Sequence, residues 1–270
     1  MEFKEKQYDG PYEISEVEIE NEGQIFRGLL YFPPESFKKP HPLVIYFHDF
    51  PQLFTLKEIV RNYQYLLEQG FAFLVFNLRG YRYSEGTISI ESQTSDSLKL
   101  MEFVRAMSEH GHFDLNDINI FAQGFGSYIA LILCSQTKII NKLLLLCPIL
   151  DLEKHVYSEK FSKSLQYINR FLPGNIHGIE DVNLFITNTK LELKKKEFRI
   201  YNFIKFVKCN RLKIILGESD KITPLSEVKQ IFKHLPKMVD LVIIPKMDHE
   251  CIDEDDNIAI NEKIKLFFIE

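Results

Sequence analysis

Six apolar runs, each about as long as a β-strand, constrain the fold of this chain more than any other feature. They lie at 42–48, 71–78, 117–122, 142–147, 212–217 and 240–245. Nearly continuous apolar strands are typical of a parallel sheet that is covered on both faces. Helical periodicity fills the gaps between them, for example over 59–67 and 98–107. The alternation of strands and helices predicts an α/β fold.

Two more strand-like segments precede these runs. "YEISEVEIE" (12–20) and "QIFRGLLYF" (24–32) flank a turn at "NEG", which predicts an antiparallel pair. The sequence therefore predicts a mostly parallel, eight-stranded sheet flanked by helices.

The stretch 152–206 interrupts the alternation of strands and helices. It is polar and aromatic, and it is too long for a structureless loop inside a domain. We expect a helical cap here, inserted into a core domain formed by residues 1–151 and 207–270. One helical face in the insertion is apolar and carries Phe161, Leu165, Ile168 and Leu172. This face could line a pocket for an apolar ligand or pack onto the core.

Composition narrows the range of partners. The formal net charge is −5 and no basic stripe appears, so nucleic acid is not an expected partner. No apolar run reaches the length of a membrane span. The charged N-terminus has no apolar core of a signal peptide. The four cysteines show no paired spacing and are predicted to be reduced thiols, so we expect a cytoplasmic protein.

The segment "INIFAQGFGSYIALILC" (118–134) has the pattern of a nucleophile elbow, G-x-S-x-G, in which a sharp strand-to-helix turn presents a serine. Small residues stand two positions before and after the centre, but the centre is Gly124. Ser127 is a poor substitute nucleophile because bulky Phe125 and Ile129 flank it at those distances. We interpret Ser127 as a packing residue of the helix.

An acid and a histidine follow in the order expected of a catalytic triad. Asp220 comes after the strand 212–217, and His249 comes after the strand 240–245. Taken singly, Asp220 could be the N-cap of the next helix and His249 a histidine with a structural partner. Cys251, two residues after His249, is a weak candidate for a displaced nucleophile, and Cys147 is predicted to be a core residue.

Together these motifs resemble the α/β-hydrolase superfamily, in its branch of serine esterases, monoglyceride lipases and feruloyl-type esterases. "EGQIFRGLLYFP" is similar to the opening hairpin of the esterases, and "PLVIYFHDF" to the strand that leads into the oxyanion loop. "LRGYRYSEG" (78–86) is similar to the loop Arg-Gly-His-Gly-x-Ser-x-Gly. The likeness covers nearly the whole chain.

The resemblance implies a role for each matching position. Gly124 would hold the nucleophile position, and Asp220 and His249 would be the catalytic acid and base. The oxyanion donors would be the backbone N–H groups of Phe50 and Phe125. Asp49 and Phe50 would contact substrate.

Asp49 departs from the family pattern, which has glycine there. Its carboxylate would oppose the stabilisation of an oxyanion unless it points outward. In the resembling loop, Arg79 and Ser84 are interpreted as hydrogen-bonding residues that order the loop. His110 and His112 have no third ligand nearby in sequence, so no metal and no other cofactor is expected.

Three functional hypotheses follow. The first is a pseudo-hydrolase that binds a small apolar or ester-type ligand or a protein partner. The N-myc downstream-regulated proteins, which also have glycine at the elbow, resemble such a non-enzymatic scaffold. The second is an enzyme, esterase-like or lyase-type, that uses the pair His249–Asp220 on water or on a substrate. The third is an ordinary carboxylesterase in which Gly124 is an engineered or misread serine.

Overall fold

The structure, a computed structural model, describes residues 7–52, 54–235, 239–251 and 253–270. Residues 1–6, part of the N-terminal segment in which we expect no signal peptide, lie outside the described residues. Within the described part of the chain, no helix is both long and apolar enough to cross a membrane.

In the part of the chain that the structure describes, nine strands form one central sheet, in the order β1-β2-β3-β5-β4-β6-β7-β8-β9. In sequence order they are β1 (Gln7–Asp9), β2 (Tyr12–Asn21), β3 (Gln24–Tyr31), β4 (His41–Phe47), β5 (Ala72–Asn77), β6 (Phe113–Gln123), β7 (Ile140–Leu146), β8 (Arg211–Gly217) and β9 (Asp240–Ile244). Strands β5, β4, β6, β7, β8 and β9 run parallel, as predicted, and β1, β2 and β3 add an antiparallel edge.

The prediction of eight strands was wrong by one. The additional strand, β1, pairs antiparallel with the start of β2, with Gln7 opposite Ile14 and Asp9 opposite Tyr12. It is short and largely exposed. Backbone hydrogen bonds to β2 and one side-chain contact, from the hydroxyl of Tyr31 to Asp9 Oδ2 (2.9 Å), hold this edge strand, so no apolar pattern marks it in the sequence.

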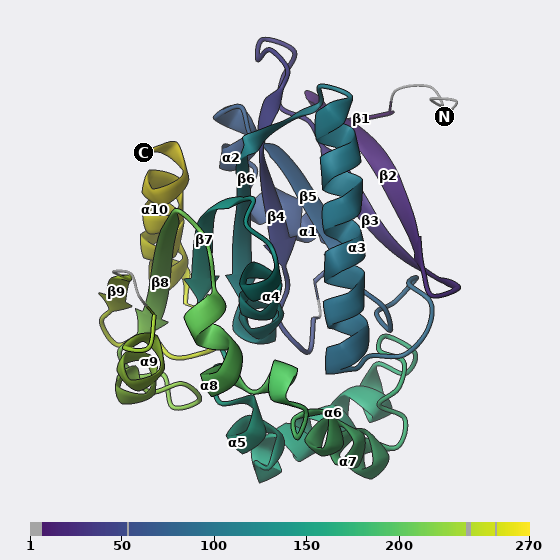
Figure 1. Ribbon diagram of the computed structural model, residues 1–270, viewed down its shortest axis with the longest axis vertical. Helices are drawn as coiled ribbons and strands as arrows, with labels where there is room; N and C mark the ends of the chain where they lie inside the picture. Colours follow the sequence, from purple (N-terminus) through teal and green to yellow (C-terminus); the bar gives the residue numbers. More distant parts are fainter. Residues whose placement is uncertain (1–6, 53, 236–238, 252) are drawn as a thin grey trace.

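Helices cover both faces of this sheet (Figure 1). The helices of the described chain are α1 (Leu56–Asn62), α2 (Tyr65–Glu68), α3 (Ile90–Glu109), α4 (Gly124–Gln136), α5 (Leu152–Val156), α6 (Glu159–Phe171), α7 (Val182–Glu192), α8 (Ile200–Phe203), α9 (Leu225–Phe232) and α10 (Glu254–Ile269), with short 3-10 turns at Lys196–Phe198 and Ile204–Phe206. The helices α3, α4 and α9 contribute to one apolar cluster, and α1, α2 and α10 to the other.

Alternation along β4 shows how the sheet separates these two clusters. Leu43 and Ile45 belong to the cluster under α3 and α4, whereas Val44 and Tyr46 belong to the cluster under α1 and α10. Successive side chains of a strand point to opposite faces, so a strand that is buried on both faces is apolar at every position. This is the physical origin of the uninterrupted apolar runs in the sequence.

The segment between β7 and β8 is helical. Its helices α5, α6 and α7 lie together at one end of the sheet (Figure 1). Phe161, Leu165 and Ile168 of α6 are buried, whereas Leu172, at the C-terminal end of the helix, is only partly buried. These helices approach the end of the sheet at which β6 passes into α4.

Candidate active site

The turn between β6 and α4 is as tight as an elbow requires. The strand ends at Gln123, and the helix begins at Gly124, whose φ is +50°. That left-handed conformation disfavours residues with a side chain. Two residues further on, a Cβ at Gly126 would lie 2.4 Å from the carbonyl oxygens of Phe47 and His48. Glycine at 126 therefore lets α4 pack against the end of β4.

The structure brings Asp220 and His249 together from the loops after β8 and β9. Asp220 Oδ2 lies 2.8 Å from His249 Nδ1. The other carboxylate oxygen, Oδ1, accepts hydrogen bonds from the backbone N–H groups of Ile222 (2.8 Å) and Thr223 (2.9 Å). The N-cap of α9 is Pro224 and not Asp220. The carboxylate thus orders its own loop and orients the imidazole.

The electrostatic surroundings favour a charged His249. Burial alone would lower the pKa of His249, but the hydrogen bond and charge of Asp220, together with the charges of Asp49 and Glu250, raise it above its ordinary value. Two carboxyl groups, those of Asp220 and Asp49, therefore stabilise the charged form of His249. A histidine held in this way is a competent general base only when it has lost its proton.

Asp49 points into the site. Its Oδ1 accepts hydrogen bonds from the backbone N–H groups of Phe50 and Phe125, both at 2.7 Å. These are the two groups that the resemblance assigns to the oxyanion hole. The outward orientation considered from the sequence is wrong, because two backbone donors at a strand end and a helix start form a ready site for an anion.

The same carboxylate fills the place of the missing side chain. A Cβ built on Gly124 would lie 1.9 Å from Asp49 Oδ1, 2.0 Å from its Cγ and 2.4 Å from its Oδ2. Heavy atoms that are not bonded do not approach so closely. Asp49 therefore occupies the space next to Gly124 that a side chain at the elbow position would need.

Burial raises the pKa of Asp49, while the charge of His249 and the N–H groups of Phe125 and Phe50 act in the opposite direction. The net effect is a pKa of Asp49 above its ordinary value, with burial as the largest cause. The carboxyl group of Asp49 occupies the position that the resemblance assigns to an oxyanion.

A small apolar cavity adjoins the elbow. It has a volume of about 20 Å³, close to that of a single water site. Four phenylalanine rings line it, those of Phe50, Phe125, Phe161 and Phe185. The centroid of the Phe50 ring lies 5.8 Å from the ring centroids of both Phe161 and Phe185. Phe50 therefore contacts α6 and α7, and these two helices cover the candidate site at the end of the sheet.

His155 of α5 also lines this cavity, and sequence analysis did not identify it. Its ring lies 4.8 Å from that of Phe161. Burial and the nearby charges of His249 and Lys160 lower the pKa of His155 to about 4, so it is neutral near pH 7. No periodicity or spacing in the insertion could have placed His155 near His249, because the two residues meet only through the packing of α5 over the sheet.

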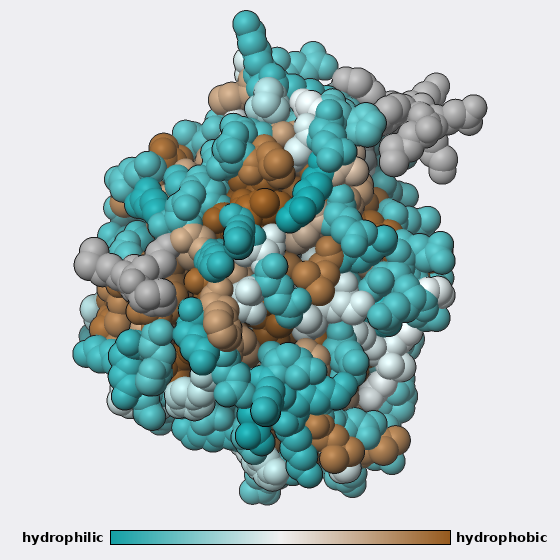
Figure 2. Space-filling view, viewed as in Figure 1, coloured by the Kyte–Doolittle hydropathy of each residue, from teal (hydrophilic) through white to brown (hydrophobic). Residues whose placement is uncertain are grey.

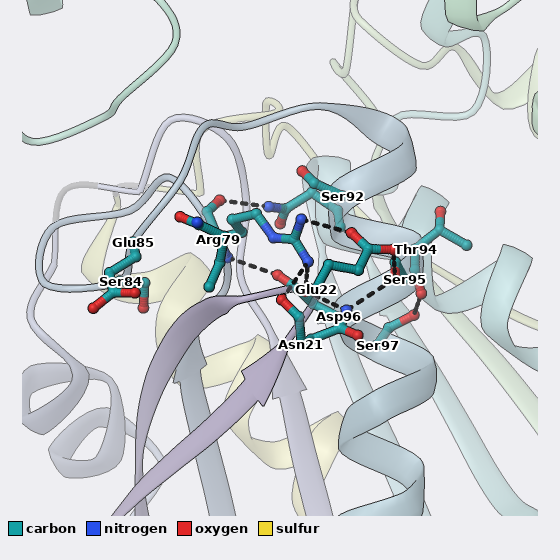
Figure 3. Close-up of polar contacts among 12 residues, drawn as sticks. Asn21, Glu22, Arg79, Ser84, Glu85, Ser92, Thr94, Ser95, Asp96 and Ser97 are labelled. Atoms are coloured by element: carbon teal, nitrogen blue, oxygen red, sulfur yellow. Dashed lines mark hydrogen bonds and ion pairs between the residues drawn. The ribbon is translucent and has the colours of Figure 1, made fainter.

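Arg79 and Ser84 lie in a separate polar network (Figure 3). Arg79 forms ion pairs with Glu22 (2.8 Å) and with the buried Asp96 (2.6 Å). Ser84 Oγ donates to the carbonyl of Asn77. These contacts join the loop after β5 to the turn between β2 and β3 and to α3. They order the loop and do not reach Asp49 or His249.

The remaining candidates, Ser127, His110 and His112, make local contacts away from Asp220 and His249. Ser127 is buried in α4, and its Oγ donates to the carbonyl of Ala122 (3.2 Å). His112 Nδ1 lies 3.1 Å from Lys39 Nζ, and His110 Nδ1 lies 2.7 Å from the carbonyl of Ala106. In the part of the chain that the structure describes, no three His, Cys, Asp or Glu side chains are arranged to hold a metal ion.

No protein-family profile matches the chain. Among curated proteins it is similar to lysophosphatidylserine lipase ABHD12 of Gallus gallus, with 24% identity over 196 residues that cover 71% of this chain and 47% of the relative. The protein of the same name from Bos taurus is 23% identical over 202 residues, which cover 73% and 46%. The chain spans about half the length of the curated relatives it matches.

Solved structures show the fold. DcsB, solved with a substrate analogue, has a TM-score of 0.68 at 17% identity, covering 94% of this chain and 98% of its own. The α/β hydrolase GrgF from Penicillium sp. sh18 has a TM-score of 0.67 at 17% identity and covers 95% and 97%. Est1E from Butyrivibrio proteoclasticus has a TM-score of 0.64 at 17% identity and covers 94% and 97%. The chain is an α/β-hydrolase-fold protein.

Proposed function

We propose that this chain is a pseudo-hydrolase, which binds a ligand or a protein partner and does not hydrolyse esters through an acyl-enzyme. One observation carries the proposal: the carboxylate of Asp49 is bonded to the N–H groups of both Phe50 and Phe125. An ester carbonyl needs these donors for the negative charge that develops on its oxygen. Here the carboxyl group of Asp49 already occupies that position and takes up both donors.

The missing hydroxyl adds to this obstacle. A triad that loses its serine typically loses about 10⁶ in kcat and retains some rate enhancement from the oxyanion hole. When the hole is blocked as well, that residual contribution is lost too. The third hypothesis, a misread or engineered serine at Gly124, fits poorly, because a serine Cβ and the observed Asp49 carboxylate would occupy the same space.

Binding has two candidate locations. The apolar cavity suits an apolar group, but its volume of about 20 Å³ admits a ligand only when α5, α6 and α7 move away from the sheet. These helices also expose large side chains to solvent, namely Tyr157, Tyr167, Phe171, Leu184 and Leu191. Apolar surface is visible at this end of the molecule (Figure 2). Such side chains suit contact with a protein partner.

Activity-based labelling tests the main proposal. We expect no covalent adduct with a fluorophosphonate and no turnover of p-nitrophenyl esters by the wild-type chain. The double variant Asp49→Gly, Gly124→Ser is the matched positive control, because it restores glycine in the oxyanion loop and serine at the elbow. A stoichiometric fluorophosphonate adduct on the wild-type protein would contradict the proposal.

The assembled pair of Asp220 and His249 supports a second candidate, an enzyme without a serine. Asp49 Oδ2 makes no hydrogen bond to a described residue, and it lies within 2.4 Å of the position of the absent Cβ. A carboxylate can act as a covalent nucleophile. Oδ2 would displace a leaving group from a saturated carbon and form an ester. Water deprotonated by His249 would then attack Cγ and release an alcohol.

Isotope labelling separates this enzyme from a pseudo-hydrolase. After incubation with an alkyl halide or an epoxide in water enriched in ¹⁸O, the enzyme candidate predicts ¹⁸O in the Asp49 side chain, found by peptide mass spectrometry. His249→Gln would retain the alkyl group on Asp49 because the ester is no longer hydrolysed. Unlabelled Asp49 and unconsumed reagents would exclude this candidate.

A further inference from the structure

Two cysteines meet beneath the candidate site, and neither role proposed above involves them. Cys147 follows the last residue of β7, and Cys251 lies two residues after His249. The two residues are 104 positions apart in the chain, yet their Sγ atoms lie 3.2 Å apart. Both side chains are buried, with exposed fractions of 1% for Cys147 and 8% for Cys251.

The backbone holds the two thiols toward one another. Cys147 has φ of +41° and Cys251 has φ of +53°, in the left-handed region that residues with a side chain rarely adopt. The N–H of Cys147 donates to the carbonyl of Ile215 (2.9 Å), and Asp248 Oδ1 accepts from the N–H of Cys251 (3.3 Å). The surrounding loops therefore hold the backbone of both cysteines in place, and the side chains place their Sγ atoms 3.2 Å apart.

We propose that Cys147 and Cys251 are a disulfide-forming pair that closes when the protein meets a peroxide. This proposal is independent of the proposed function. A disulfide has an S–S separation of about 2.05 Å, so the sulfur atoms must approach by about 1.2 Å. Rotation about the two Cα–Cβ bonds and a small shift of the loop after β9 would supply that movement. The other two cysteines, Cys134 and Cys209, lie elsewhere in the sequence and the fold.

The chemistry balances with peroxide as the oxidant. The sulfur of Cys251, the more exposed of the two, attacks one peroxide oxygen and the O–O bond breaks; the leaving hydroxide takes the proton of the thiol, so a sulfenic acid and water form. The sulfur of Cys147 then attacks Cys251 Sγ, the S–O bond breaks, and a second water leaves. In total, two thiols lose two electrons and two protons to one hydrogen peroxide and give one disulfide and two waters.

The surroundings support this order of events. The hydrogen bond to Cys251 and burial raise the pKa of Cys147 well above its ordinary value. Cys147 therefore keeps its proton until Cys251 has been oxidised. Cys251 lies nearer the surface and belongs to the loop that carries His249, with its Sγ 3.5 Å from the carbonyl of His249.

The bond would join two parts of the site. Ile149, two residues after Cys147, donates its N–H to the carbonyl of Gly124 (3.0 Å). A bond between Cys147 and Cys251 would thus connect the segment that supports the elbow to the loop that presents His249. Closing a loop of this length restricts the unfolded chain strongly, so the oxidised protein should melt at a higher temperature than the reduced one.

The experiment uses the full chain. Reduced protein is treated with hydrogen peroxide, and the remaining thiols are alkylated in denaturant before proteolysis and mass spectrometry. We expect a linked peptide pair that contains Cys147 and Cys251, while Cys134 stays alkylatable. The melting temperature should rise on oxidation and return with dithiothreitol. Cys251→Ser should abolish the linked pair, whereas the matched control Cys209→Ser should retain it.

Two results would overturn the proposal. One is wild-type protein in which Cys251 proceeds to sulfinic acid while Cys147 remains a thiol. The other is a linked pair that joins different cysteines. If Cys251→Ser does not fold, as judged by circular dichroism, the peptide map of the wild-type protein decides alone, because it needs no variant.

Discussion

The two halves of the candidate site differ in how far they depart from the geometry of a hydrolase. The base half, Asp220 and His249, forms a hydrogen-bonded pair at 2.8 Å from two loops that follow successive strands. The nucleophile half, Gly124 with Asp49 and the N–H groups of Phe50 and Phe125, has no hydroxyl and holds a carboxyl group instead. The difference teaches that the two unusual residues of the nucleophile half depend on each other: Asp49 fits because residue 124 has no side chain.

The largest expected effect is a gain of esterase activity when both residues of that dependent pair, Asp49 and Gly124, are replaced. Asp49→Gly with Gly124→Ser should gain at least about 10²-fold in the hydrolysis of p-nitrophenyl acetate over the wild type, because a nucleophile and an open oxyanion hole each contribute that much or more. Gly124→Ser alone should stay inactive, since Asp49 still occupies the hole. Equal activity of the single and double variants would show that Asp49 is no obstacle.

The next effect concerns the base half. Asp220→Ala should lower the free energy of unfolding by about 3–4 kcal/mol, because it leaves a buried imidazole and two loop N–H groups without their partner. Asp220→Asn retains an oxygen for the N–H groups of Ile222 and Thr223 and should lose less. Urea denaturation of both variants measures the difference. A loss below about 1 kcal/mol for Asp220→Ala would mean that water replaces the carboxylate readily.

A smaller effect isolates the crowding at Gly124. Gly124→Ala should destabilise the fold by about 2–3 kcal/mol, from its left-handed backbone together with the overlap with Asp49. Gly111→Ala is the matched control: its φ is +75°, yet no atom lies within 4 Å of the new Cβ, so only the backbone cost of about 1 kcal/mol is expected. Addition of Asp49→Ala should reduce the loss at Gly124 to that of the control.

The smallest effect is a pH dependence at the contact between α5 and the site. The pKa of His155 is about 4 in the folded protein and near 6.5 in the unfolded chain, so unfolding takes up a proton between these values. Stability should therefore fall as pH decreases from about 6.5 to 4, by about 2 kcal/mol for this half-buried group. His155→Gln should weaken this slope. An unchanged slope, measured by urea denaturation across that range, would mean that His155 is solvated.

The base half could be predicted from the sequence, and the nucleophile half only in outline. Asp220 and His249 each follow an apolar strand, and parallel strands end at one edge of a sheet, so their meeting follows from chain order. Asp49 was recognised as unusual, but whether its side chain pointed in or out depended on the conformation of the loop after β4. The position of His155 at the site could not be predicted, because it lies in the insertion and no sequence pattern there indicates how α5 packs over the sheet.

The sequence by itself determined the alternating α/β architecture, since strands buried on both faces must be apolar at every position. It also determined the absence of a hydroxyl at the elbow, which is a matter of residue identity. The tertiary structure alone decided what fills the space at Gly124, and that two cysteines 104 positions apart face each other. These contacts join loops that are distant in the chain, and their side-chain directions depend on packing that local sequence patterns do not encode.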